Sequence, residues 1–254
     1  MGSLLEVQGL FRRFGGLIAV ADVSFAVEKG QIFGIIGPNG AGKTTLFNVI
    51  AGHYRPSAGT VTFDGRDISG HSSDGVARQG IARTFQAVQV FGKHTAAENL
   101  RRGGVIRHGH NPFAYFTRDA RIREGGADLN EVARFVGVSD CLGSTAGSLA
   151  YGLQKLLGIG MAMMVSPKLL LMDEPAAGLN PSEKKAAAVL IRRLRDELGI
   201  TILLVEHDMP LVMGICDRIL VINRGKQIAL GAPAEVKADK AVIEAYLGED
   251  YEFA

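Results

Sequence analysis

The chain reads Gly37-Pro38-Asn39-Gly40-Ala41-Gly42-Lys43-Thr44-Thr45 directly after the apolar run at residues 31–36. This is the GxxxxGK[ST] pattern of a phosphate-binding loop, and it stands between an expected strand and an expected helix, as such a loop must. Glycines let successive backbone N–H groups point at phosphate oxygens, and the positive end of the following helix dipole adds to the attraction. The nine residues predict a nucleoside triphosphate site in which Lys43 reaches the β- and γ-phosphates and the Thr44 hydroxyl binds Mg²⁺.

Composition narrows the class of protein. A chain of 254 residues is long enough for a hydrophobic core that needs neither disulfides nor structural metal. The formal charge of +2 is too small to favour a nucleic acid as partner. The two cysteines, Cys141 and Cys216, lack metal-ligand or CxxC spacing, which is typical of free thiols in a reducing compartment. We therefore expect a cytosolic location and no nucleic-acid partner.

The sequence predicts no membrane-spanning segment. Its start lacks the basic and then apolar pattern of a secretory signal. The longest uncharged apolar run, residues 156–165, is shorter than the ~20 residues that a spanning helix needs. We therefore expect any membrane association to depend on a partner protein.

Short β-like runs with glycine turns open the chain and predict an antiparallel β layer. After residue 160, alternating strand and helix patterns predict a parallel sheet with the chemistry at its carboxyl edge. The expected strands are 4–10, 19–27, 31–36, 168–172 and 201–205, with hairpins around 61–65 and 223–225 and helices over 181–198 and 234–247.

The sequence between these two parts has a different character. Residues 87–159 contain Gly-Gly pairs, a loop-like stretch at 108–112 and a helical pattern at 128–136, which predict an inserted helical subdomain. The expected fold is α/β, a P-loop NTPase core with an antiparallel β subdomain and an inserted helical subdomain. The expected units are the RecA-like core with the β subdomain (1–86 and 160–233), the helical subdomain (87–159) and a C-terminal helical extension (234–254).

Two adjacent carboxylates, Asp173 and Glu174, end the apolar strand that precedes them. Beside a phosphate-binding loop, Asp173 would lie near Mg²⁺, and Glu174 would polarise the water that attacks the γ-phosphate. Adjacent acids at a strand end are common on protein surfaces. Combined with the loop, however, they predict a hydrolytic site.

Two more polar residues follow strands at the same expected edge. An isolated histidine is more often solvated or packed than catalytic, but the position of His207 after the strand at 201–205 favours contact with the γ-phosphate. Gln86 ends a short β run where the insert begins. Its amide is a candidate ligand for Mg²⁺ or a metal-bound water and a candidate hinge, although most glutamines at strand ends have neither role.

Six motifs stand in the order found in the nucleotide-binding subunits of ATP-binding cassette (ABC) transporters, and the chain resembles that family over essentially its whole length. The resemblance implies ATP and Mg²⁺ as cofactors and an ATPase coupled to solute transport, with Glu174, His207 and Gln86 as catalytic residues. Phe14 matches the aromatic residue that stacks on adenine. The motifs are Walker A at 37–45, the Q-loop at Gln86, the signature at 149–154, Walker B at 169–174, the D-loop at 177–180 and the switch histidine His207.

The same resemblance assigns residues around the nucleotide. The implied magnesium ligands are Thr44, Gln86 and Asp173. The implied nucleotide-binding residues are Phe14, Gly37, Pro38, Asn39, Gly40, Ala41, Gly42, Lys43, Thr44, Thr45 and Asp173.

In this family two cassettes pair head to tail, and each ATP lies between Walker A of one and the signature of the other. The implied residues acting across that interface are Leu149, Ala150, Tyr151 and Gly152. The resemblance thus implies a second ABC ATPase subunit (identical or different), transmembrane permease subunits and, indirectly, a solute-binding protein. The implied location is the cytoplasmic face of the bacterial inner membrane, as a peripheral protein.

The signature departs from the usual pattern of the family. Ala150 stands where serine is common, and Leu153, Leu156, Gly158 and Met161 stand where relatives tend to carry polar or charged groups. Two interpretations remain open. The helix has drifted toward apolar packing, or a composite site in a heterodimer is weakened.

Longer phrases at 13–17, 80–86, 149–152, 173–181 and 245–248 resemble ATP-binding subunits of branched-chain amino-acid importers, a subfamily whose members also serve urea, amide or aromatic solutes. The alternative function is a soluble ABC ATPase that acts as an assembly or scaffold motor. A P-loop kinase or GTPase is a third possibility, but the chain lacks a guanine-reading Asn-Lys-x-Asp run. The segment 87–98, with Val88, Val90 and Phe91, is predicted to form a docking groove for a helix of the membrane subunit.

Overall fold

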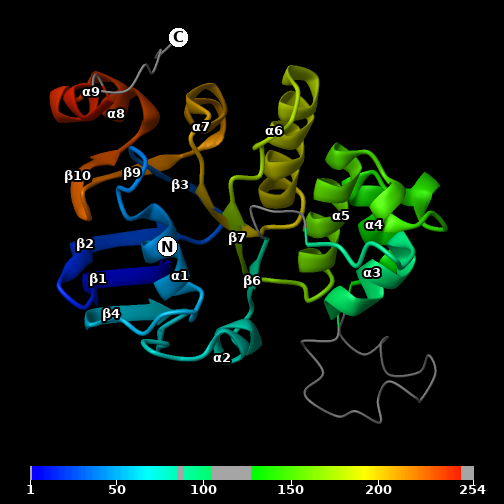
Figure 1. Ribbon diagram of the computed structural model, residues 1–254, viewed down its shortest axis with the longest axis horizontal. Coiled ribbons are helices and arrows are strands. Elements are labelled where there is room, and N and C mark those ends of the chain that lie inside the picture. The colour runs from blue at the N-terminus through cyan, green and yellow to red at the C-terminus, as the bar shows by residue number, and fades with distance from the viewer. Residues whose placement is uncertain (1, 85–88, 105–126, 247–254) are drawn as a thin grey trace.

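The computed structural model describes residues 2–84, 89–104 and 127–246. Two sheets organise this part of the chain (Figure 1). The smaller sheet is antiparallel with the order β2-β1-β4-β5. Its strands are β1 (Ser3–Phe14), β2 (Leu17–Glu28), β4 (Ala58–Phe63) and β5 (Arg66–Asp67).

The larger sheet has the order β10-β9-β3-β8-β7-β6. The pairings from β9 through β6 are parallel, and β10 joins β9 as an antiparallel edge strand. Its strands are β3 (Ile32–Ile36), β6 (Ile81–Arg83), β7 (Leu169–Asp173), β8 (Thr201–Val205), β9 (Arg218–Asn223) and β10 (Lys226–Gly231). The predicted α/β fold, with an antiparallel layer beside a parallel sheet, is confirmed.

The central strands β3, β7 and β8 are buried along their whole length. Successive side chains of a strand point to opposite faces, so each strand contributes to two separate hydrophobic clusters. In β7, Leu170 and Met172 belong to one cluster, whereas Leu169 and Leu171 belong to the other. Continuous apolar runs of this kind are what a parallel sheet covered on both faces requires.

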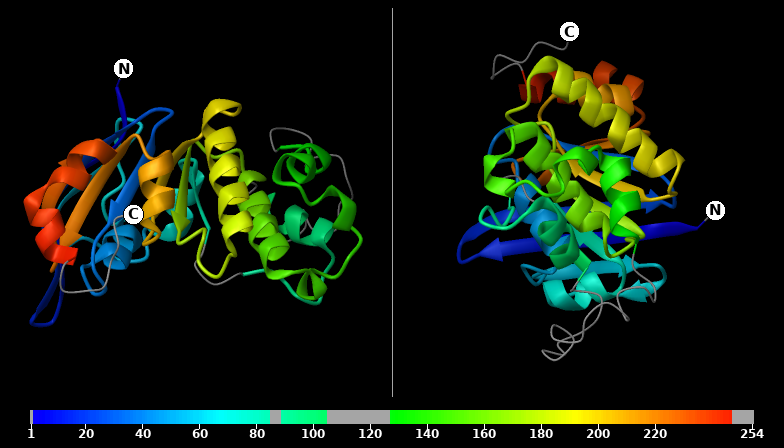
Figure 2. Two further views of the ribbon diagram at one scale, coloured as in Figure 1. Left: turned by 90° about the horizontal axis from the view of Figure 1, so that it is seen from above. Right: turned by 90° about the vertical axis from the view of Figure 1, so that its right-hand side faces the viewer.

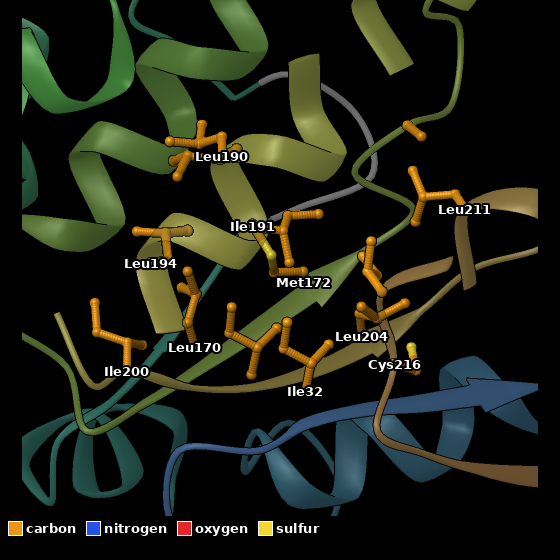
Figure 3. Packing of buried hydrophobic residues seen from close by; sticks show 14 of the residues in the cluster. Ile32, Leu170, Met172, Leu190, Ile191, Leu194, Ile200, Leu204, Leu211 and Cys216 are labelled. Atoms are coloured by element: carbon orange, nitrogen blue, oxygen red, sulfur yellow. The ribbon is translucent and has the colours of Figure 1, made fainter. Parts of the chain in front are cut away.

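Different elements cover the two faces. On one face, α1 (Lys43–Ile50) and the antiparallel sheet share a cluster with the inward side chains of the parallel strands. On the other face lie α6 (Pro181–Asp196) and α7 (Met209–Ile215). Figure 3 shows Leu170 and Met172 beneath Leu190, Ile191 and Leu194 of α6.

The described part of the segment between β6 and β7 contains three α-helices joined by loops and by the short 3₁₀ helices at Ser139–Cys141 and Ala146–Ser148. The three α-helices are α3 (Ala96–Gly103), α4 (Leu129–Val136) and α5 (Tyr151–Met163), preceded by α2 (Ser73–Arg78). These three helices form a group at one end of the molecule (Figures 1 and 2). A Cβ atom on Gly103 would lie 2.2 Å from the Met161 carbonyl oxygen, so α3 and α5 are in very close contact.

The predicted end of the helical unit at residue 159 falls inside α5, which continues to Met163. The buried residues of the helical group also belong to the same cluster as one face of the parallel sheet. The division of the chain into separate units therefore stays a prediction. Among the described residues, no helix is both long enough and apolar enough to cross a lipid bilayer.

The segment predicted as one helix over 234–247 is helical in its described part, but it is divided into two helices. These helices are α8 (Pro233–Ala238) and α9 (Lys240–Tyr246). Asp239 separates them with an extended backbone, ψ 123°, and its Oδ1 accepts a hydrogen bond from the Ala241 N–H at 2.8 Å. Aspartate competes for backbone N–H groups at a helix start, and this preference breaks the periodic pattern into two short helices.

The two-sided burial of β7 makes a testable prediction. Leu170→Ala should lower the free energy of unfolding by about 2–5 kcal/mol, because it removes a fully buried side chain and leaves a cavity beneath α6. Urea denaturation followed by circular dichroism measures the effect. Val189→Ala on the same helix is the control, since Val189 is 54% exposed. Equal losses in both variants would contradict the assignment of Leu170 to the core.

Candidate active site

The phosphate-binding loop runs from the end of β3 at Ile36 to the start of α1 at Lys43. Gly37 has φ 152°, and a Cβ atom there would lie 2.0 Å from the Ile222 carbonyl oxygen. Gly42 has φ 103°, and its Cβ atom would lie 2.3 Å from the Ala19 carbonyl oxygen. Both positions therefore require glycine. The loop is fixed between the end of β9 and strand β2.

The basic side chain of the loop lies against the loop's own backbone. The Lys43 Nζ atom donates to the carbonyl oxygens of Gly37 and Pro38 at 2.5 and 3.0 Å. Gly42, the N-cap of α1, makes no side-chain cap, so the first-turn N–H groups remain available to an anion. Thr44 is exposed and Thr45 is half-buried. This arrangement can hold a phosphate group.

Asp173 ends β7 and is only 6% exposed. Its Oδ2 lies 2.9 Å from Nη2 of Arg83, which ends β6. A second Arg83 nitrogen, Nη1, donates to Asn48 Oδ1 of α1 at 2.7 Å. Burial raises the pKa of the Asp173 carboxyl group, and the Arg83 guanidinium opposes this rise. Arg83 thus connects the acid at the end of β7 to the helix that follows the phosphate-binding loop.

Glu174 and His207 lie side by side at the carboxyl edge of the sheet. The distance between Glu174 Oε2 and His207 Nδ1 is 3.7 Å. The Glu174 side chain is 21% exposed and that of His207 is 50% exposed. The two side chains that the sequence places after different strands therefore meet, with room for solvent beside them.

A buried carboxylate lies behind this pair. Glu206 is 1% exposed, and its two oxygens accept hydrogen bonds from the backbone N–H groups of Ala176, His207 and Asp208 at 2.7, 3.1 and 3.3 Å. Burial raises the pKa of Glu206, and the three N–H groups oppose this rise. Glu206 ties the loop after β7 to the loop after β8.

Phe14 stands at the end of β1, beside the turn into β2, and is 38% exposed. It packs edge-on against Tyr54 with ring centroids 5.2 Å apart, and the Arg12 guanidinium lies 4.3 Å from the Phe14 ring centre. The same strand β2 contributes the Ala19 carbonyl that meets the phosphate-binding loop. An aromatic surface is therefore available on the hairpin that borders the loop.

The signature residues lie away from that loop. Tyr151 starts α5, with Ala150 as its N-cap, and both are exposed. In two perpendicular views α5 lies beyond β7 from α1 (Figures 1 and 2). Gly152 packs against α6, because a Cβ atom there would lie 2.7 Å from Glu183 Oε1. Leu149 is half-buried.

The atypical residues of α5 pack or line a groove. Leu153, Leu156 and Met161 are partly buried against the hydrophobic cluster that contains Leu170, Met172 and the buried residues of α6, which we call the main hydrophobic cluster. A Cβ atom on Gly158 would have no neighbour within 4 Å, and Gly158 lines a groove of about 1120 Å³ between the helical group and β6. These positions favour the apolar-packing interpretation over a direct effect on the nucleotide site.

The groove also tests the predicted docking segment. Phe91 lines it and is 46% exposed, whereas Val90 packs against the main hydrophobic cluster and does not belong to an exposed apolar set. Gln86 and Val88 lie outside the described residues. The predictions for these two residues are therefore not tested.

Sequence reasoning did not assign a role to Arg83, Glu206 or Lys155. Lys155, on α5, donates to the carbonyl oxygens of Glu174 and Pro175 at 2.9 and 3.3 Å. All three are charged residues, and each has at least one partner that is distant in sequence: Asp173 for Arg83, Glu174 for Lys155 and Ala176 for Glu206. For Glu206, the available signal in the sequence was its position directly before the motif residue His207.

Comparisons with known proteins agree with this geometry. The sequence profile of the family described as ABC transporter matches residues 20–177, and that of the branched-chain amino acid ATP-binding cassette transporter matches residues 226–252. The high-affinity branched-chain amino acid transport ATP-binding protein BraF of Pseudomonas aeruginosa is 45% identical over 97% of this chain and 98% of its own. Its counterpart LivG of Escherichia coli (strain K12) is 42% identical with the same coverage.

Solved structures are similar as well. A crystal structure of a nucleotide-free ATP-binding cassette from an ABC transporter covers 98% of this chain and 100% of its own, with 33% identity and a TM-score of 0.86. The ADP conformation of an ATP-binding cassette gives the same values. The profile covers more than half of the chain, and the relatives cover nearly all of it. The chain therefore belongs to the ABC transporter family, in which it is an ATP-binding cassette.

Proposed function

We propose that this chain hydrolyses ATP to drive an importer of branched-chain amino acids, at the cytoplasmic face of a bacterial inner membrane. One observation carries the proposal. Asp173 ends a strand, and the phosphate-binding loop, Glu174 and His207 follow strands, at the carboxyl edge of one parallel sheet. That edge is where ligands bind in open α/β sheets. The names of the curated relatives support the branched-chain solute and do not favour a scaffold ATPase.

Each residue would have a distinct role in hydrolysis. The loop N–H groups and Lys43 bind the phosphates, and the exposed ring of Phe14 stacks on the adenine. Glu174 accepts a proton from the water that attacks the γ-phosphate. His207, 3.7 Å from the Glu174 carboxylate, contacts the γ-phosphate and orients that water. Gln86 is proposed to complete this group.

The residues also fit a bound Mg²⁺ ion. Mg²⁺ prefers oxygen ligands and is commonly held by one or two carboxylates together with substrate phosphates. Asp173 supplies a carboxylate and Thr44 a hydroxyl, and we propose Gln86 as a third group. No cluster of three or more His, Cys, Asp or Glu residues suited to a metal occurs in the described ranges, so an all-protein cage is not the expected arrangement. When bound, Mg²⁺ would neutralise phosphate charge.

We propose that a second cassette, identical or different, completes each ATP site. The exposed Ala150 and Tyr151 at the start of α5, beyond β7 from α1, support this arrangement. The phosphate groups of ATP bound to the partner cassette would contact the N-terminus of α5, which has no side-chain cap, and the backbone of Leu149 and Gly152. The helix dipole favours an anion at this position.

We further propose that a permease subunit docks in the groove between β6 and the helical group, and that a solute-binding protein acts outside the membrane. Phe91 offers an exposed ring there, and its backbone N–H is held by Oδ1 of the fully buried Asn99 at 2.7 Å. The Arg102 guanidinium stacks on the Phe91 ring at 4.7 Å. A rigidly held aromatic side chain suits the role of an anchor for a docked helix.

Hydrolysis should depend on Glu174. Glu174→Gln should keep ATP affinity but lower the hydrolysis rate ~10²–10⁴-fold, because the amide cannot accept the proton. Lys43→Ala should instead weaken ATP binding. Phosphate release and equilibrium binding of ATP measure the two effects, and Glu131→Gln on the exposed start of α4 is the control. A near-normal rate in Glu174→Gln, in a preparation free of other ATPases, would contradict the proposed role.

Transport should depend on Phe91 without any change at the nucleotide site. Phe91→Ala should leave ATP binding intact and uncouple hydrolysis from branched-chain amino-acid uptake in reconstituted vesicles. Truncating a central aromatic anchor can cost at least ~2 kcal/mol of binding. Leu198→Ala is the matched control, because Leu198 is 47% exposed beyond the end of α6. Normal uptake by Phe91→Ala at normal expression would place the docking surface elsewhere.

A further inference from the structure

Glu174 has a strained backbone. Its φ is 47°, in the left-handed region that side chains other than glycine rarely adopt. Such conformations persist only where the surrounding structure determines them, and they gather at functional sites.

Three segments of the chain hold the backbone around Glu174. The Glu174 N–H donates to the Val205 carbonyl oxygen at the end of β8, at 2.8 Å. The Glu174 carbonyl oxygen accepts from Lys155 Nζ at 2.9 Å, and the Pro175 carbonyl oxygen lies 3.3 Å from the same nitrogen. The next N–H, of Ala176, donates to Glu206 Oε1 at 2.7 Å. Both carbonyls and the following N–H are thus held by charged side chains.

Lys155 is notable for its position. It is the one charged residue within α5, Tyr151–Met163. Its ammonium group donates hydrogen bonds to backbone carbonyl oxygens. Burial lowers the pKa of Lys155, and the negative charges of Glu206 and Glu174 oppose this change. A hydrogen bond from a charged donor is about twice as strong as one between neutral groups. The bonds to Glu174 and Pro175 therefore give α5 a firm attachment to the loop after β7.

Glu206 completes the attachment from the other side. Its carboxylate is fully enclosed and joins the Ala176 N–H to those of His207 and Asp208. The loop that carries Glu174 and the loop that carries His207 therefore share one buried anion. Their spacing, 3.7 Å between the two side chains, depends on both loops being held.

We propose that Lys155 and Glu206 are positioning residues that hold the strained Glu174–Ala176 backbone, and so direct the Glu174 carboxylate toward the attacking water. The inference rests on the proposed catalytic role of Glu174. It adds that the signature helix controls hydrolysis within its own chain, through Lys155, besides any contact across the cassette interface.

Lys155→Met tests the proposal, because methionine keeps most of the side-chain length but removes the charge and the N–H donors. Misplacement of a reacting group by about 1 Å can cost on the order of 100-fold in rate. We expect kcat for ATP hydrolysis to fall ~10- to 100-fold, with KM and the equilibrium affinity for ATP within about twofold of wild type. Lys155→Arg, which restores the charge and donors, should recover most of the rate.

Lys168→Met is the matched control. Lys155 and Lys168 both line the groove, but the Lys168 ammonium pairs with Asp64 at 2.6 Å. Among the described residues, it is Lys155 and not Lys168 that donates to the carbonyl oxygens of Glu174 and Pro175. Lys168→Met should keep wild-type kinetics. In a Glu174→Gln background, Lys155→Met should lower the remaining rate no further, because residues that act through one group are not additive.

The outcomes separate this inference from the proposed function. Normal hydrolysis in Glu174→Gln would overturn the catalytic role itself. Slow hydrolysis in Glu174→Gln together with a normal kcat in Lys155→Met would overturn only the positioning role. A loss in Lys155→Met that also raises KM, or that adds to the loss in Glu174→Gln, would do the same. If Lys155→Met does not fold, as judged by thermal unfolding, Glu206→Gln decides by the same criteria.

Discussion

The central constraint on this molecule is the burial of β3, β7 and β8 on both faces. Each strand is apolar except for Thr201 at the start of β8 and Asp173 at the end of β7, and the apolar side chains alternate between two clusters. Because water is excluded from both faces, the polar side chains of the site lie at the ends of these strands or in the loops after them. The antiparallel sheet with α1 must cover one face, and α6 with α7 the other. Burial of this apolar area is the dominant favourable term in folding.

The register of the sheet then decides which polar residues meet. Asp173 pairs with Val205, and Ile35 pairs with the same residue on its other side. The three strands therefore end at nearly the same level. The phosphate-binding loop, the two acids and His207 emerge from this common edge. Parallel pairing thus brings together residues that are more than a hundred positions apart in the sequence.

Much of the fold and the site could be predicted from the sequence because their signals are local. The loop from Gly37 to Thr45 has fixed spacing, and β8 was predicted with the bounds that it has, Thr201–Val205. The break at Asp239 was missed because a helical period and a capping preference compete there. The docking groove predicted for 87–98 includes Val90, but Val90 packs against the cluster that contains Leu170 and Met172, and this contact depends on segments distant in sequence.

The contacts of Arg83, Lys155 and Glu206 also depend on segments that are distant in sequence, so they could not be predicted from local patterns. Each of these side chains is charged and would by itself be assigned to the surface. Their burial depends on carbonyls, amides or acids supplied by other parts of the chain. Lys155 and its partner Glu174 are 19 residues apart, and Glu206 and Ala176 are 30 apart. Sequence alone reveals the residues that touch a nucleotide more readily than those that hold them.

Helix α5 joins two surfaces that are otherwise separate. It has 13 residues, so its length is about 20 Å at 1.5 Å per residue. Tyr151 stands at its exposed start, and Met161 lines the groove near its other end. If occupancy of one end alters affinity at the other, linkage requires the effect to be equal in both directions. If a bound permease raises the affinity for nucleotide through this helix, bound nucleotide raises the affinity for the permease by the same factor.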